Sequence, residues 1–143
     1  MIKLIYLFIL TFGVISCSSD EETAINNSDL IGNWNWTSTG GGFSGDLNET
    51  PITTGKTYNL NLNANYTYFL LENQTEISSG TYELTMRESI YSQETERFIS
   101  YSDSFEQPQS LVISGVIRAF ENTNLSISDN NHDGIGSIFE KIE

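Results

Sequence analysis

Apolar and polar residues alternate along most of the chain after Leu30, and a period of two predicts β-strands rather than helices. The clearest case is 56–63, where an apolar residue takes every second position from Tyr58 to Leu62 and the positions between are asparagine. Similar runs, separated by turn residues, predict about eight strands, at 31–39, 56–63, 66–72, 80–86, 97–103, 111–120, 124–128 and 137–142.

Short strands in this meander spacing predict an all-β fold, either a sandwich or an antiparallel up-and-down barrel. Closure into a barrel removes the exposed strand edges, and the interior of such a barrel is either filled by side chains or holds one small ligand. We expect 111–120 to bend at Gly115. The Gly40–Gly55 segment is long and glycine-rich, and segments of this kind are often lids, binding loops or simply mobile. The stretch 104–109 is typical of a plain connector.

The first residues have the pattern of an export signal. A positive start at Met1–Lys3 is followed by an almost unbroken apolar run at 4–15. The run is too short for a transmembrane helix, which needs about 20 apolar residues, but it suits a secretory signal, whose apolar region has about 7–15. We therefore expect a signal peptide at 1–16 that is removed before Cys17.

Cys17 is the only cysteine in the chain, so the folded part has none for a disulfide. A small residue followed by cysteine at the end of the apolar run resembles the lipobox of bacterial lipoproteins, in which the new N-terminal cysteine carries a diacylglyceryl group. Stable anchoring needs at least two acyl chains, so the resemblance implies lipidation of Cys17 and a membrane-anchored protein. The alternative is a chance cysteine in an ordinary signal peptide.

Polar residues fill most of 17–29, which predicts a flexible tether before a domain at 30–143. The Ser-Asp-Glu-Glu run at 19–22 resembles the surface-export signal of Bacteroidota lipoproteins and implies an outer-membrane lipoprotein exposed at the cell surface. The alternative is an ordinary acidic linker. The net charge of −13 argues against nucleic acid and against electrostatic docking on anionic lipid, since both need basic patches.

Three short segments resemble lipocalin-like domains in the form common to Bacteroidota lipoproteins. Leu30–Trp34 resembles their Gly-x-Trp opening, Gly80–Leu84 their central Gly-x-Tyr strand, and Ile138–Ile142 their closing strand with an aromatic and a basic residue. The resemblance covers most of 29–143 and implies a calycin-type barrel of about eight strands. The chain departs from secreted lipocalins in lacking disulfides and a clear Thr-Asp-Tyr loop.

The resemblance also implies structural roles for four residues. In lipocalins the opening tryptophan plugs the closed end of the barrel, and a basic residue from a late strand stacks on it. Gly32 and Trp34 match the opening, and Lys141 or Arg118 is implied as the cation over the ring. These roles do not name a ligand.

Aromatic residues at strand positions are candidates for the lining of a ligand cavity, because tyrosine and tryptophan suit a site that is apolar with a wet end. The candidates are Trp36, Tyr58, Tyr66, Tyr68, Tyr82 and Tyr101. Packing of a small β-sheet core would use the same residues. If they line a cavity, we expect a small apolar ligand to enter beneath Gly40–Gly55.

The segment 129–134, together with Glu140, matches the spacing of a calcium loop. In such a loop, oxygens at positions 1, 3 and 5 and a glutamate at position 12 surround one cation, which makes Asp129, Asn131, Asp133 and Glu140 candidate calcium ligands. The flanking segments are predicted strands, whereas an EF-hand needs helices. A hairpin turn without metal is therefore the alternative.

The sequence offers little for catalysis. His132 is the only histidine and has no thiol or second imidazole with which to hold zinc. The carboxylate pairs Glu94–Glu96 and Glu72–Glu76 lie in polar stretches typical of solvated strand ends. We therefore predict a lipoprotein that is not an enzyme and that binds a small apolar ligand or an envelope protein partner. The alternative is an accessory subunit of a surface or outer-membrane complex, and a filled barrel would favour it.

Overall fold

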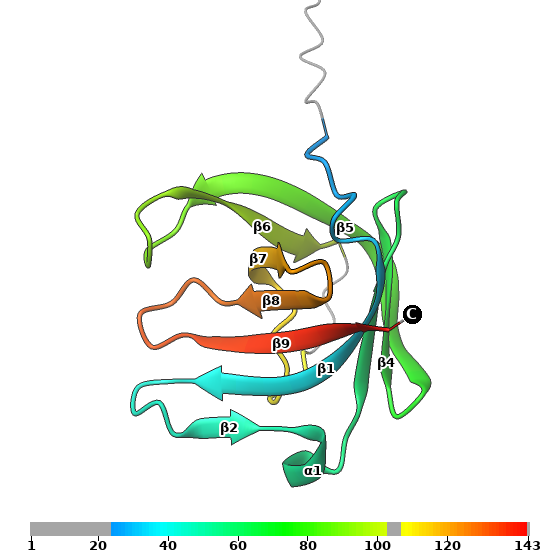
Figure 1. The fold of residues 1–143 in the computed structure, drawn as a ribbon, viewed down its shortest axis with the longest axis vertical. Coiled ribbons are helices and arrows are strands. Elements are labelled where there is room, and N and C mark those ends of the chain that lie inside the picture. Colours follow the sequence, from blue (N-terminus) through cyan, green and yellow to red (C-terminus); the bar gives the residue numbers. More distant parts are fainter. Residues whose placement is uncertain (1–23, 103–106, 143) are drawn as a thin grey trace, which may run out of the picture.

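The computed structural model describes residues 24–102 and 107–142, which form nine strands and one short helix (Figure 1). The strands are β1 (Gly32–Gly41), β2 (Leu47–Glu49), β3 (Tyr58–Leu62), β4 (Thr67–Glu72), β5 (Thr75–Glu88), β6 (Thr95–Tyr101), β7 (Gly115–Phe120), β8 (Asn124–Ser128) and β9 (Ile135–Ile142), and the helix is α1 (Pro51–Thr54). The signal peptide, Cys17 and residues 18–23 of the tether lie outside the described residues. In the described part, no helix has the length and apolar character needed to cross a bilayer.

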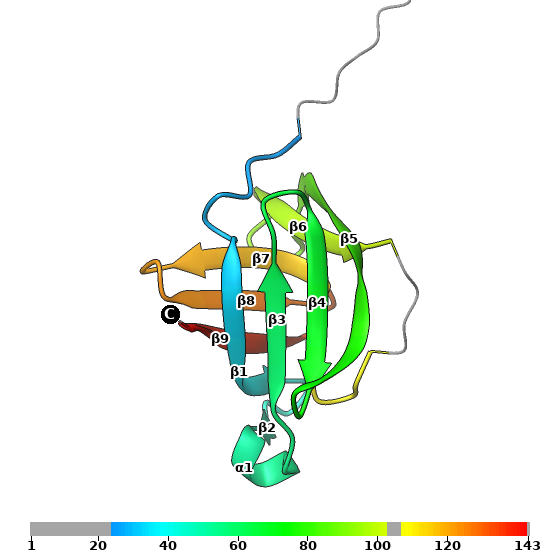
Figure 2. The same ribbon diagram turned by 90° about the vertical axis from the view of Figure 1, so that its right-hand side faces the viewer.

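Eight of the strands close into an antiparallel, lipocalin-like barrel, which confirms the predicted fold class. Strands β3 to β9 pair in chain order, and β9 closes the barrel by pairing with β1 from Asn33 to Gly41. The other edge of β1 pairs with β3 in its first part and with β2 in its last part. Strand β2 is therefore an addition to the barrel, and Figure 2 shows β1, β3 and β4 side by side in its wall.

The interior of the barrel is packed with side chains. In β3, Tyr58, Leu60 and Leu62 are buried while the asparagines between them are partly exposed. Side chains of all eight barrel strands join one contiguous core. Within it, the largest side chains with 0% exposure are Trp34, Trp36, Tyr58, Tyr68 and Phe139.

The predicted strand 111–120 is shorter than expected. Strand β7 begins only at Gly115, and Leu111 and Ile113 lie in the core instead of in a strand. Gly115 has φ +134, and a Cβ at this position would overlap the Ser128 carbonyl oxygen. The chain therefore needs glycine to enter β7 close to the backbone of β8.

Two other segments hold more regular structure than expected. The Gly40–Gly55 segment contains β2 and α1. The Thr50 side chain caps the start of α1, and Gly55 ends it in a left-handed conformation with φ +68. Strand β5 begins at Thr75 rather than at Gly80, because its first half pairs with β4.

Candidate functional site

One end of the barrel is covered by residues 24–30, which we call the strap. Figure 1 shows the strap, in blue, crossing β5 before the chain continues into β1. The Asn27 amide donates to the Tyr82 hydroxyl (2.6 Å) and to a backbone carbonyl in the turn between β3 and β4 (3.2 Å). The Tyr66 hydroxyl donates to the Ile25 carbonyl (2.8 Å). The strap is thus attached to the barrel by hydrogen bonds from β5 and from the β3–β4 turn.

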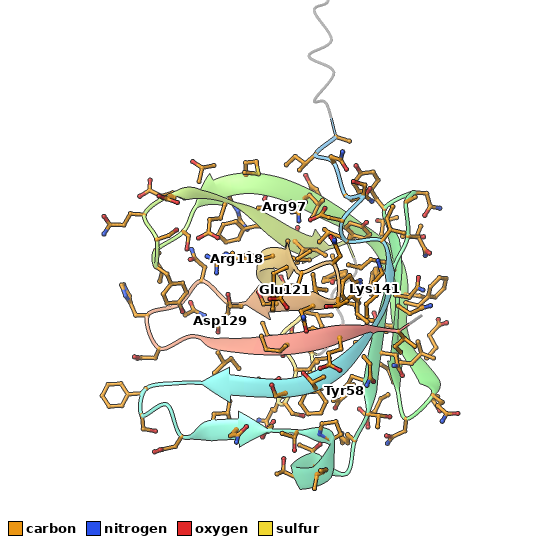
Figure 3. The ribbon with its side chains drawn as sticks, in the orientation of Figure 1. Tyr58, Arg97, Arg118, Glu121, Asp129 and Lys141 are labelled. Carbon is orange, nitrogen blue, oxygen red and sulfur yellow. The ribbon has the colours of Figure 1, made fainter. Side chains whose placement is uncertain are left out.

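Arg97 on β6 holds the strap from another side. Its guanidinium donates to the Asn26 carbonyl (3.1 Å) and forms a bidentate pair with Asp29 (2.9 and 2.5 Å). This guanidinium holds the pKa of the Asp29 carboxyl below its ordinary value. Figure 3 shows Arg97 beside the strap. The strap is therefore fixed by charge as well as by neutral hydrogen bonds.

Beneath the strap, Trp34 fills the end of the barrel. Its indole Nε1 donates to the Leu30 carbonyl (2.8 Å), and the Lys141 Nζ lies 5.3 Å from a Trp34 ring centroid. A Cβ at Gly32 would meet the Lys141 side chain, so glycine leaves room for this lysine. The first and last strands of the barrel thus meet over one buried ring, in the geometry of a cation–π contact.

Strands β6 and β7 separate soon after they meet, since only two residue pairs, at Phe98–Ile99 of β6, join them within the described chain. Farther along, the guanidinium of Arg118, which Figure 3 labels, makes a bidentate ion pair with Glu96 across the opening. Arg118 therefore pairs with a carboxylate, and the cation over Trp34 is Lys141. A hydrogen bond from Ser92, together with Arg118, holds the pKa of Glu96 below its ordinary value.

Two grooves border the strap. The first, of about 690 Å³, is lined by Ile25, Tyr66 and five consecutive residues of β5, Tyr82–Met86. The second, of about 630 Å³, lies where β6 and β7 separate, and Ile25 and Met86 line it as well. Tyr66 and Tyr82, with ring centroids 5.5 Å apart, are thus the two predicted ligand-lining aromatics that border a groove of this size.

The other predicted aromatics pack against one another inside the barrel. Trp36 and Tyr58 make an edge-to-face contact with centroids 5.3 Å apart, and Tyr68 and Tyr101 lie 4.3 Å apart. The hydroxyls of Tyr58 and Tyr101 are buried and find no hydrogen-bond partner among the described residues. Burial raises the pKa of Tyr101 well above its ordinary value. Trp36, Tyr58 and Tyr68 therefore build core, whereas Tyr101 packs against the core and also borders a small groove of about 140 Å³.

The end of the barrel opposite the strap is closed from within by 111–113, three residues that are at most 2% exposed. The buried Thr39 hydroxyl donates to the Ser110 carbonyl (2.8 Å), and the Ser137 hydroxyl accepts from a backbone amide of 111–113 (2.7 Å). Gly40–Gly55 leaves the barrel at this end. Core side chains of 111–113 lie at this end of the barrel, and entry of a ligand beneath Gly40–Gly55 stays a prediction.

The candidate calcium loop forms the hairpin between β8 and β9. One Asp129 oxygen accepts from the Ile135 amide (3.0 Å) and the other from the Asn131 side chain (3.2 Å), so both residues stabilise the turn itself. Glu140 is an exposed residue of β9, beyond the hairpin, and Asp133 is exposed at its tip. Residues 24–102 and 107–142 contain no cluster of three or more His, Cys, Asp or Glu that could hold a metal. Calcium binding stays a prediction.

Comparisons with protein-family models, curated proteins and solved structures found no match. The candidate site is therefore defined by geometry alone: a packed barrel, a strap across one end, and two grooves beside it. No local pattern in the sequence pointed to the contacts of Asn27 with Tyr82 or of Arg97 with Asp29, because the partners lie far apart along the chain.

Proposed function

We propose that the chain is an outer-membrane lipoprotein, anchored through a diacylated Cys17, that works as a non-enzymatic accessory protein through the outside of its barrel. The packed interior supports this most strongly. Side chains of all eight barrel strands meet in one core, and 111–113 occupies the end where a lipocalin-type ligand would be expected to enter. A barrel whose interior is filled by core side chains recognises a partner through its outer surface.

The position of the strap agrees with an anchor. Ala24 is separated from Cys17 by a short polar stretch, whose seven steps span at most about 25 Å when fully extended. The strap end would then stay near the membrane, and the opposite end would point away from it. That distal region presents Phe43 and Ile52 with 91% and 93% exposure, and α1 buries no residue of its own. Exposed apolar side chains of this size suit contact with an envelope protein.

A second candidate function is supported by the groove along β5. Its volume of about 690 Å³ is in the range of small-molecule sites, about 300–1,000 Å³. Tyr66, Tyr82 and Leu84 would offer apolar surface to a small apolar ligand there. This alternative places the ligand beside the strap and not inside the barrel.

Intact-mass spectrometry separates these functions in one preparation. The full chain is purified from membranes in mild detergent and weighed under native and then denaturing conditions. We expect a covalent diacylglyceryl mass on a chain that begins at Cys17, retained on denaturation, and no additional mass that denaturation releases. The Cys17→Ala chain should lack the acyl mass and the cleavage.

The lipid anchor and the accessory function can be disproved independently of each other. An unmodified Cys17, or an acyl mass that survives Cys17→Ala, would overturn the anchor. A small molecule of a few hundred daltons that leaves on denaturation in repeated preparations would overturn the accessory function and favour the ligand carrier.

A further inference from the structure

The second half of β5 has a paired strand on only one side. Residues Thr75 to Thr81 pair with β4, whereas Tyr82 to Glu88 pair with β6. Over Tyr82–Glu88 the edge that faces away from β6 therefore has no strand partner in the described part of the chain. Figure 1 shows this half of β5 at the rim of the barrel, and the groove of about 690 Å³ follows it. An open strand edge is a template for another strand.

The backbone groups that point to this edge can be assigned. The Tyr82 amide donates to the Tyr66 carbonyl (2.8 Å) on the β4 side, while the Thr81 carbonyl accepts on the β6 side. Backbone groups alternate in direction along a strand, so those of Leu84 and Met86 point to the open edge. Residues 24–102 and 107–142 supply no hydrogen-bond partner to them.

The sequence of this edge is complementary to itself about Thr85. When two copies lie antiparallel with Thr85 opposite Thr85, Leu84 faces Met86 and Glu83 faces Arg87. This register makes Leu84 and Met86 hydrogen-bonded pairs, which uses the backbone groups that are open. It also places apolar residues together on one face and opposite charges together on the other. A slip by one residue would lose both matches.

Glu83 and Arg87 are available for such pairs. The other two arginines of the chain each bind a carboxylate. Arg87 lies opposite Glu96 in the β5–β6 register, yet Glu96 pairs with Arg118, and Arg87 has no ion pair within the described residues. Its guanidinium lies over the Phe98 ring, 4.3 Å from the centroid, which leaves N–H groups at its rim for a carboxylate. Both Glu83 and Arg87 are exposed.

We infer that the protein forms a dimer in which the β5 edges of two copies pair antiparallel about Thr85. The pairing joins Leu84 to Met86 through backbone hydrogen bonds and Glu83 to Arg87 through ion pairs, each twice by symmetry. Pairing of so few residues buries less than the roughly 1,200 Å² of a stable complex, so the free dimer is weak. Two copies anchored in one membrane would pair more readily because their effective concentration is higher.

Cysteine cross-linking tests the register in the full chain within its membrane. Opposed residues of a non-hydrogen-bonded antiparallel pair have Cα atoms about 4.5 Å apart, within disulfide range. Mild oxidation of the Thr85→Cys chain should therefore shift it from monomer to a dimer that reductant dissolves. The matched control is Thr81→Cys, on the same face of the same strand and outside the proposed ion pairs. Its two copies would lie about 27 Å apart and should stay monomeric. The unchanged chain, oxidised in parallel, reports any contribution of Cys17.

Charge exchange in the Thr85→Cys chain provides an independent test. Glu83→Arg or Arg87→Glu alone should reduce the cross-linked dimer, because like charges then face each other. A mixture of the two chains should restore it as a heterodimer, since each arginine again faces a glutamate. Cross-linking that is no stronger at 85 than at 81 would overturn the dimer. An amount of cross-linked dimer that is unchanged by the charge exchange would also overturn the proposed dimer. Neither outcome depends on the acyl mass or on the barrel interior, so the proposed function is tested separately.

Discussion

Two walls close the same barrel by different means. In the first, β8, β9, β1 and β3, neighbouring strands pair almost continuously, and the inward side chains Trp34, Trp36 and Phe139 have 0% exposure. In the second, β5, β6 and β7, only two residue pairs join β6 to β7, and side chains and the strap complete the closure. The grooves and the open edge all lie in the second wall. Incomplete backbone pairing thus leaves surface on which binding can occur.

The largest difference between the walls should appear on truncation of one side chain in each. Trp34→Ala removes a fully buried ring in contact with Lys141 and should cost about 3–5 kcal/mol in the free energy of unfolding. Met86→Ala in the second wall should cost only about 0.5 kcal/mol, because Met86 is 51% exposed. Urea denaturation of both variants measures the comparison. Equal losses would mean that the second wall is packed as tightly as the first.

The first wall is also the part that the sequence predicted best. Two of its strands, β3 and β8, alternate strictly. The segments that resemble lipocalin-like domains include Trp34 and Lys141, which the fold brings together. The alternation of apolar and polar residues predicts these strands because one face of each strand is buried.

The strands of the second wall at 80–86 and 97–103 were predicted, and β5 and β6 confirm them. The segments that complete the closure of this wall were not predicted, for physical reasons. The apolar run 111–113 has the composition of a strand, but tertiary packing places it inside the barrel as an irregular segment. Most strap residues are polar, as in a tether, and they take fixed positions through contacts with residues distant in sequence, such as Asp29 with Arg97 and Asn27 with Tyr82. Local patterns cannot report contacts of this kind, and the candidate site consists mostly of them.

Gly115 at the start of β7 and Gly45 provide a second comparison, in which the expected difference in stability is smaller. Gly115→Ala should lower the stability by about 2–3 kcal/mol, because a side chain is strained at φ +134 and its Cβ would push β7 from the Ser128 carbonyl. Gly45→Ala is the matched control: φ is also positive, +70, but a Cβ there meets nothing within 4 Å. Its cost should be about 1 kcal/mol. Thermal or urea unfolding of the two variants measures both losses of stability. Equal losses would show that the close approach of β7 to β8 does not require glycine at position 115.

The smallest effect is expected at the ion pair that attaches the strap to the second wall. Arg97 lowers the pKa of Asp29, so the stability from this pair is present above the unfolded pKa, near pH 4, and is lost as the pH falls through the lowered folded value. Asp29→Asn should therefore cost about 0.2–1 kcal/mol at about pH 7, the range of exposed pairs.

The same substitution should cost progressively less as the acid is protonated in both states, so the unchanged chain and the Asp29→Asn chain converge below about pH 4. Urea midpoints of the two chains across this pH range measure the convergence, with Asp133→Asn as a control, since Asp133 is exposed and forms no ion pair in the described chain. A constant difference between the unchanged chain and the Asp29→Asn chain at all pH values would mean that the strap is held by its neutral hydrogen bonds from Asn27 and Tyr66 and not by charge.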